Sequence, residues 1–204
     1  MDRRRLLMLQ QEQEGLPSGY TQLNYLKSTG AQYINTGYIY GSNSDFSTEM
    51  YFNNAYGQLC GAVDDNAKIA LAKDGGRLYF ARCNGNLGAP GKDSNNYLCK
   101  LSTHGAILTA IYAKDGSEIT NTFDNSAYDF GGTTIPFYLF GRNNNGSATL
   151  TGGTLNIYFF SFFENGSMVM NLVPCLDSNG TPCMFDTVKR KTFYNAGTGD
   201  FLWG

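Results

Sequence analysis

The sequence predicts an all-β protein built as a two-sheet antiparallel sandwich or jelly roll. The chain has 14 Tyr, 14 Phe and 25 Gly among 204 residues and only 16% charged residues, which is typical of aromatic strands joined by glycine turns. Apolar and polar residues alternate along many short segments, and helical periodicity is missing after residue 19. We therefore expect residues 1–19 to form a short helical or extended tail and residues 20–204 to form one jelly-roll domain.

The alternation is clearest in residues 45–52, where Phe46, Met50 and Phe52 fall on one side of a half-buried strand. Similar runs predict further strands at residues 59–63, 68–72, 77–83, 106–113, 135–141 and 155–163. Asn-Gly dipeptides, which favour tight hairpin turns, begin at residues 84, 145, 165 and 179.

The strongest hairpin signal lies in residues 156–175. Its first strand is expected to carry Ile157, Phe159, Ser161 and Phe163 along one side, because side chains alternate between the faces of a strand. Residues 164–167 are expected to turn the chain, and residues 168–174 to form the return strand.

Charge and cysteine content exclude several classes of protein. The net charge is -2, and basic residues are scattered outside residues 3–5 and 189–191, so we expect no nucleic-acid partner. No apolar run is long enough to cross a bilayer, so we expect no membrane partner either. Five cysteines without Cys-x-x-Cys spacing favour buried thiols over a metal site or a disulfide framework.

Two blocks of sequence together resemble a known family. "LPSGYTQLNYLKSTGAQYINTGY" near the start and "NIYFFSFFENGSMVMNLVPCLDSNGTPCMFDTVKRKTFYNAGTGDF" near the end are similar to the concanavalin A-like, or laminin-G-like, jelly-roll domains of gut bacteria, their prophages and phages. The resemblance implies that the first and last strands lie together. Tyr33 is then expected to point inward or to stack, and residues 195–199 to close the same region.

The extreme N-terminus, "MDRRRLLMLQQ", resembles the leader that precedes this domain in phage-derived proteins. The resemblance implies a virion protein, such as a head or tail fibre or a decoration protein, with a bacterial cell surface as the alternative location. It also implies a homo-oligomer anchored to other virion proteins through its tail. The anchoring residues would be Arg3, Arg4, Arg5, Leu6, Leu7 and Leu9.

Catalysis is not expected. Related jelly rolls that hydrolyse β-glucans carry Glu-x-Asp-x-x-Glu, which places a nucleophile and an acid/base carboxyl in one groove, and this chain has no such pattern. Glu49 has no carboxylate at alternate positions, and Glu118 is expected in a turn. The one histidine, His104, is expected in a loop and lacks a nucleophile elbow.

Recognition of a bacterial surface glycan is the better candidate, because sugar sites combine aromatic rings with short amide or carboxylate side chains. Three polar loops carry these residues: Asp64, Asp65 and Asn66; Asn96 and Tyr97; and Arg142, Asn143 and Asn144. Ordinary hairpin loops have the same composition, and a purely structural interaction protein remains the alternative. Asp64 and Asp65 also offer the oxygen ligands that calcium prefers, although a full ligand set is missing from the sequence.

Overall fold

The computed structural model describes residues 15–84, 91–93 and 97–204, and all its regular structure is β-strand, which confirms the all-β prediction. The strands are β1 Thr21–Gln22, β2 Leu26–Ser28, β3 Ile34–Gly41, β4 Ser44–Val63, β5 Lys68–Asp74, β6 Arg77–Cys83, β7 Lys92–Asp93, β8 Leu98–His104, β9 Ile107–Lys114, β10 Ser117–Asp124, β11 Gly132–Leu139, β12 Gly141–Asn144, β13 Ser147–Glu164, β14 Ser167–Leu176, β15 Pro182–Asp186, β16 Lys191–Phe193 and β17 Leu202–Trp203.

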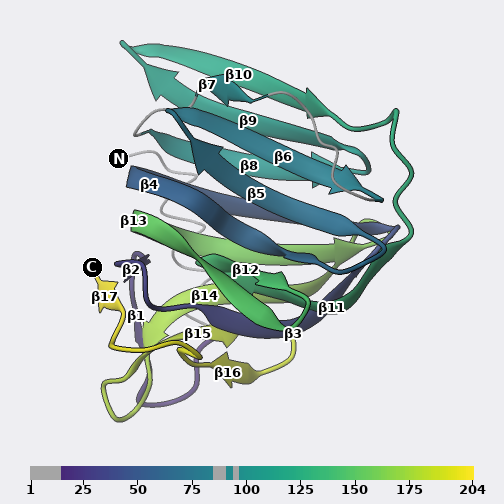
Figure 1. Cartoon of the computed structure of the whole chain (residues 1–204). Helices are drawn as coiled ribbons and strands as arrows, with labels where there is room; N and C mark the ends of the chain where they lie inside the picture. Colours follow the sequence, from purple (N-terminus) through teal and green to yellow (C-terminus); the bar gives the residue numbers. More distant parts are fainter. Residues whose placement is uncertain (1–14, 85–90, 94–96) are drawn as a thin grey trace.

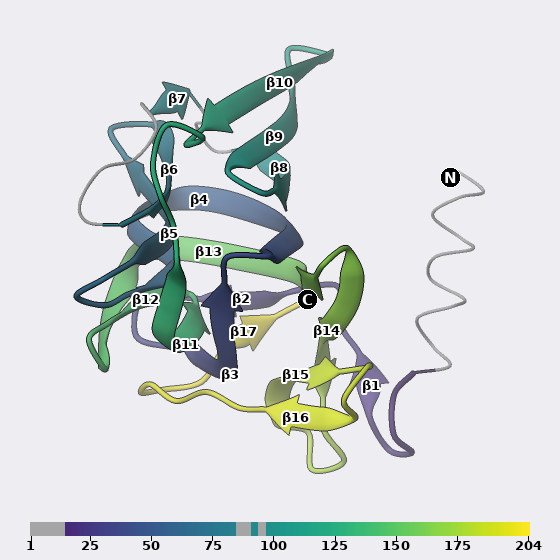
Figure 2. The same cartoon turned by 90° about the vertical axis from the view of Figure 1, so that its right-hand side faces the viewer.

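The two longest strands, β4 and β13, run through two parts of the sheet that pack against each other. We call these parts the first arm and the second arm. They pair with each other in antiparallel register from Ser44↔Glu164 to Gly57↔Thr151. In the first arm, the N-terminal half of β4 continues through β8, β9 and β10, and β13 continues through β14, β15 and β16. In the second arm, the C-terminal half of β4 pairs with β5 on one side and with β11 and β12 on the other. β6 then pairs with β5, and β3 pairs with β11. Figures 1 and 2 show β4 and β13 running from one arm into the other.

An aromatic core fills the space between the arms. Phe46, Phe160 and Phe162 come from the first arm, and the Phe160 centroid lies 5.3 Å from that of Phe46 and 4.8 Å from that of Phe162. Phe137 and Tyr40 come from the second arm, and the Phe137 centroid lies 5.6 Å from that of Phe160. The alternation predicted for residues 45–52 is confirmed, because Phe46, Phe52 and their alternate neighbours are buried in this core. Burial of rings of this size is the main source of stability in such a sheet.

Most strands predicted from the alternation are confirmed within one to a few residues, and so is the hairpin turn. Glu164 pairs with Ser167, while Asn165 and Gly166 between them have φ angles of 49° and 78°. Positive φ at both central positions is the geometry that an Asn-Gly turn favours.

The side assignment within β13 was wrong. The pairing with β4 shifts by one residue between Ile157 and Phe159, which is a β-bulge. A bulge reverses the alternation, so Phe160 and Phe162 follow Ile157 into the core while Phe159 is only half-buried.

Two segments expected in turns or loops are strands instead. Glu118 lies in β10, which pairs with β9 along eight residues, and His104 is the last residue of β8. Polar residues occupy most positions of β10, so alternation could not identify the strand. Backbone pairing with β9 supplies the stabilisation that side-chain burial does not.

The two blocks at the ends of the chain lie side by side, as expected. The Ala196 amide donates to the Tyr33 carbonyl at 2.8 Å, and the Tyr33 amide donates to the Asn195 side chain at 3.2 Å. The Tyr33 ring stacks on Tyr138 with centroids 4.9 Å apart. Gly197 is required here, because a Cβ at this position would lie 2.2 Å from the Ala31 carbonyl oxygen.

The chain enters the domain along β14 and β15. Leu16 and Tyr20 pack on a small second cluster of buried side chains, in which the Tyr20 ring meets Phe185 edge-on at 5.7 Å. The anchoring residues expected between Arg3 and Leu9 lie outside the described residues. Within the described part of the chain, no helix is long and apolar enough to span a membrane.

Candidate ligand-binding face

The outer side of the first arm carries a group of tyrosines. Strand register places Asn156 of β13 directly between Lys27 of β2 and Tyr51 of β4. Because paired residues point to the same side of a sheet, these side chains project together, opposite the buried Met50 and Ile157.

A second row lies beside the first. Tyr158 follows Asn156 at the bulge, and its ring centroid is 5.4 Å from that of Tyr25. Glu49 of β4 projects from the same side and lies directly opposite Lys100 of β8. We call Tyr25, Glu49, Tyr51, Asn156 and Tyr158 the tyrosine face.

The other four residues of the tyrosine face act electrostatically on Tyr158. Burial raises the pKa of the Tyr158 phenol, whereas a polar contact with the Asn156 amide acts to lower that pKa. Tyr25, Glu49 and Tyr51 each add a smaller rise to the pKa of Tyr158 through their charges. The phenol therefore remains a neutral hydrogen-bonding group at neutral pH.

Asn156 is the most unusual member of the tyrosine face. Its side chain is only 8% exposed, and its Oδ1 atom is buried without a hydrogen-bond partner in the described structure. An unpaired buried carbonyl of this kind costs about 1–3 kcal/mol of stability. A hydroxyl or amide that donates to Oδ1 would recover that cost, so the atom is an unpaired acceptor beneath the tyrosine face.

A shallow pocket extends the tyrosine face toward the β13–β14 turn. It has a volume of about 260 Å³ and is lined by Asp45, Ser47, Ser102 and Phe163 among others. Ser47 and Ser102 are paired across β4 and β8, two residues along from the Glu49 and Lys100 pair. The outer side of the first arm thus offers aromatic rings, an amide, a carboxylate and hydroxyl groups along one surface.

The residues expected to bind ligand lie elsewhere, and two of their three loops meet. The Asp65 carboxylate accepts a hydrogen bond from the Asn145 side chain at 2.8 Å, which joins the β4–β5 turn to the β12–β13 turn. Asn66 and Asn144 are exposed beside this contact. Asn96 lies outside the described residues, and Tyr97 stacks on Tyr112 of β9 at 4.9 Å, away from both turns.

Several polar groups in these loops hold the turns together. Asp64 accepts hydrogen bonds from the amides of Asn66, Ala67 and Thr134 at 2.6–2.9 Å and from the Thr134 hydroxyl at 2.9 Å. Burial acts to raise the pKa of Asp64, but these donors outweigh it and hold the pKa below its ordinary value. The carboxylate therefore ties the β4–β5 turn to β11, which is a structural role.

Arg142, Asn143 and Asn144 are not loop residues. All three lie in β12, where Asn143 is 1% exposed, donates to the Pro136 carbonyl and accepts from the Gly146 amide. Arg142 projects from the opposite side of the strand. Among the residues that the structure describes, no three His, Cys, Asp or Glu side chains are grouped closely enough to hold a metal ion.

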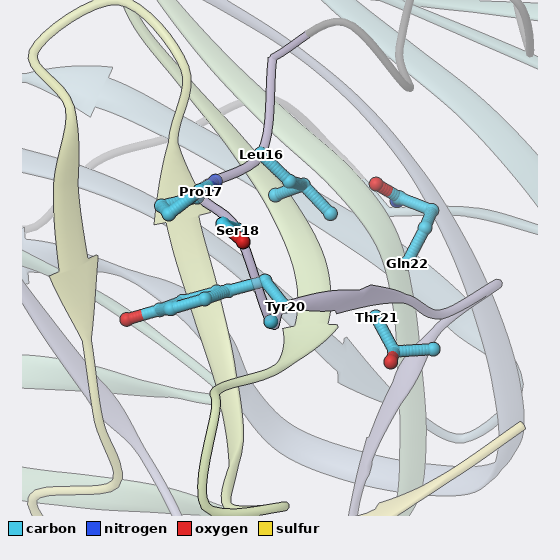
Figure 3. Close-up of a pocket in the computed structure, with 7 residues that line it drawn as sticks. Leu16, Pro17, Ser18, Tyr20, Thr21 and Gln22 are labelled. Carbon is cyan, nitrogen blue, oxygen red and sulfur yellow. The ribbon is translucent and has the colours of Figure 1, made fainter.

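A larger pocket lies at the start of the described chain. Residues 16–22 line its volume of about 460 Å³, and Figure 3 shows the Tyr20 ring directed away from Leu16 and Gln22. Gln22 donates to the carbonyls of Leu23 and Pro174, both at 3.2 Å, while its Oε1 atom is buried without a partner. Because all its lining residues are consecutive and the chain before residue 15 is not described, the tyrosine face is the better-defined site.

Sequence reasoning identified only part of the tyrosine face. The alternation in residues 45–52 already placed Glu49 and Tyr51 on the polar side of a strand. It gave no sign that Tyr25, Asn156 and Tyr158 lie beside them, since that depends on register between distant strands.

A scan against protein-family models and a search of curated proteins found no match to this chain.

Proposed function

We propose that this chain is a non-catalytic carbohydrate-binding protein with a concanavalin A-like, two-sheet jelly-roll domain, and that it binds glycan on its tyrosine face. The observation that carries the proposal is the buried, unpartnered Oδ1 of Asn156 between Tyr51 and Tyr158. Tyrosine rings suit the apolar faces of sugar rings, and an amide oxygen suits their hydroxyls.

The form of the surface favours an extended ligand. The tyrosine face and the pocket beside it follow the strands over several residues and remain open. Glu49 lies opposite Lys100, and Lys27 lies opposite Asn156, so the surface has no single sign of charge. A neutral oligosaccharide fits this surface better than a strongly acidic one.

On the sequence resemblance, we place this domain on a phage virion, facing a bacterial surface glycan, with residues 1–19 as its anchor to other virion proteins. The alternative is a structural interaction protein of the virion or cell surface. Leu202 and Trp203, each 51% exposed on β17, are the observation that favours the alternative, because exposed apolar side chains of this size are common in protein contacts.

Glycan-array screening of the full chain, with bacterial polysaccharides included, tests the proposal. We expect specific binding that falls by about tenfold or more in Tyr51→Ala and Asn156→Leu, since each removes a central contact. Asn144→Ala is the matched control, because Asn144 is an exposed amide at the end of β12.

Two results would contradict the proposal. If Asn144→Ala abolished binding and Tyr51→Ala did not, the site would lie in the loops. If the folded chain bound no glycan and its self-association depended on Leu202 and Trp203, the structural alternative would hold.

A further inference from the structure

Two basic side chains lie close together on the outer side of the second arm. Lys68 of β5 pairs with Val63 of β4, and Arg142 of β12 pairs with Gly61 of the same strand. Val63 and Gly61 are two residues apart and point to one side, so Lys68 and Arg142 project on that side from either edge of β4. Their sequence neighbours, Ile69 and Asn143, face the opposite way and are buried.

Neither cation has a carboxylate partner in the described part of the chain. The Nε atom of Arg142 is buried and makes no hydrogen bond. Burial lowers the pKa of Lys68, and the charge of Arg142 lowers that pKa further. Burial alone lowers the pKa of Arg142, and the Cys83 thiol is the one acidic group that acts on the pKa of either side chain, with a smaller effect on Lys68 than burial or Arg142.

This arrangement is costly for the free protein. Two partly buried like charges repel each other, and a buried guanidinium donor without an acceptor loses its hydration. The missing component is a negatively charged acceptor between the two cations.

We propose that Lys68 and Arg142 form a binding site for a phosphate or sulfate group. The guanidinium offers planar paired donors and the ammonium a compact charge, a combination that suits an oxyanion carrying up to two negative charges. The site lies on a different arm from the tyrosine face and does not depend on the proposed function. It accepts either a free ion or the same group attached to a polymer.

Side-chain and backbone NMR of the full chain tests this site. Titration with sodium phosphate and with sodium sulfate is compared with sodium chloride at equal ionic strength. We expect saturable shifts of the Arg142 Nε–H and of the Lys68 and Gly61 amides with the two oxyanions only. A phosphorylated or sulfated oligosaccharide that displaces the inorganic ion with higher affinity would identify a polymer-borne group, and weaker competition would identify the free ion.

Substitutions distinguish a built site from general charge attraction. Lys68→Met and Arg142→Gln should each weaken phosphate binding by about tenfold or more, because each removes one charge-assisted contact. Lys189→Met is the control, since Lys189 is an exposed cation near β16, and it should leave affinity unchanged. Lys68→Met also removes the repulsion on Arg142, so it should fold at least as stably as the parent chain.

Shifts that grow linearly with each salt, chloride included, would overturn the proposal. So would an affinity for phosphate that Lys68→Met and Arg142→Gln leave unchanged while both variants retain the dispersed spectrum of the folded chain.

Discussion

Replacing Asn156 by leucine should stabilise the free protein while removing its ligand binding. The parent side chain is 8% exposed and holds a buried carbonyl without a partner. Leucine has nearly the same shape and no polar atom, so the substitution removes a desolvation cost of about 1–3 kcal/mol. Loss of the polar contact with Tyr158 offsets part of this gain, which leaves an expected increase of about 1–2 kcal/mol in the free energy of unfolding.

Urea unfolding followed by circular dichroism, together with calorimetry, measures the effect. For a chain of this size the expected gain corresponds to a rise in Tm of about 2–8 °C. Asn143→Leu is the matched control, because Asn143 is 1% exposed and both its polar atoms are bonded, at 2.8 and 2.9 Å. That variant should lose about 1–3 kcal/mol.

The reasoning would be refuted if Asn156→Leu unfolded at the same or a lower urea concentration with an unchanged m-value. Such a result would mean that the Asn156 carbonyl is already satisfied in the free protein. The case for an unpaired acceptor beneath the tyrosine face would then fail as well.

Three further outcomes follow from the structure. Gly197→Ala should destabilise the chain by about 1–3 kcal/mol in urea unfolding, because the new methyl meets the Ala31 carbonyl; an unchanged midpoint would contradict the close approach of the two chain ends. The lowered pKa of Asp64 contributes stability that is present above its unfolded pKa of about 3.9 and is lost as pH falls through its lower folded pKa. As pH falls from neutral to acid, the free energy of unfolding should therefore decrease less steeply in Asp64→Asn than in the parent chain. If the two proteins lost stability in parallel, the Asp64 carboxylate would not contribute this pH-dependent stability. The Sγ atoms of Cys175 and Cys183 lie 3.5 Å apart in register on β14 and β15, so a disulfide-type oxidant such as oxidised glutathione should link them. Each thiol then loses one proton and one electron to that oxidant. Mass spectrometry should find this bond and none among the other three cysteines, which are buried apart; a different pairing would be inconsistent with the register.

The sequence by itself determined the all-β class and much of the local structure. Alternation in residues 45–52 and the Asn165-Gly166 turn depend on interactions between near neighbours, which the sequence encodes directly. The resemblance of the two end blocks also predicted that Tyr33 and residues 195–199 lie together, and the backbone hydrogen bonds between them agree.

Polar composition alone did not distinguish a strand from a turn, or a ligand site from a turn. Glu118 was expected in a turn but lies in β10, which is held by backbone pairing with β9. Asp64 and Asn143 have the residue types of a binding loop, yet their polar atoms are bonded within the turns and strands. Asp and Asn side chains can bind a ligand or stabilise a turn with the same hydrogen-bonding groups. Only the hydrogen-bond partners seen in the structure distinguish the two roles.

Tertiary structure decided which side chains share a surface. The bulge after Ile157 turns Phe160 into the core and leaves Tyr158 on the outer side, next to Tyr25. Register across β2, β13 and β4 then places Asn156 between Lys27 and Tyr51, residues that lie far apart in the chain. Alternation fixes the two sides of each strand, but the alignment of one strand against another depends on packing of the whole sheet.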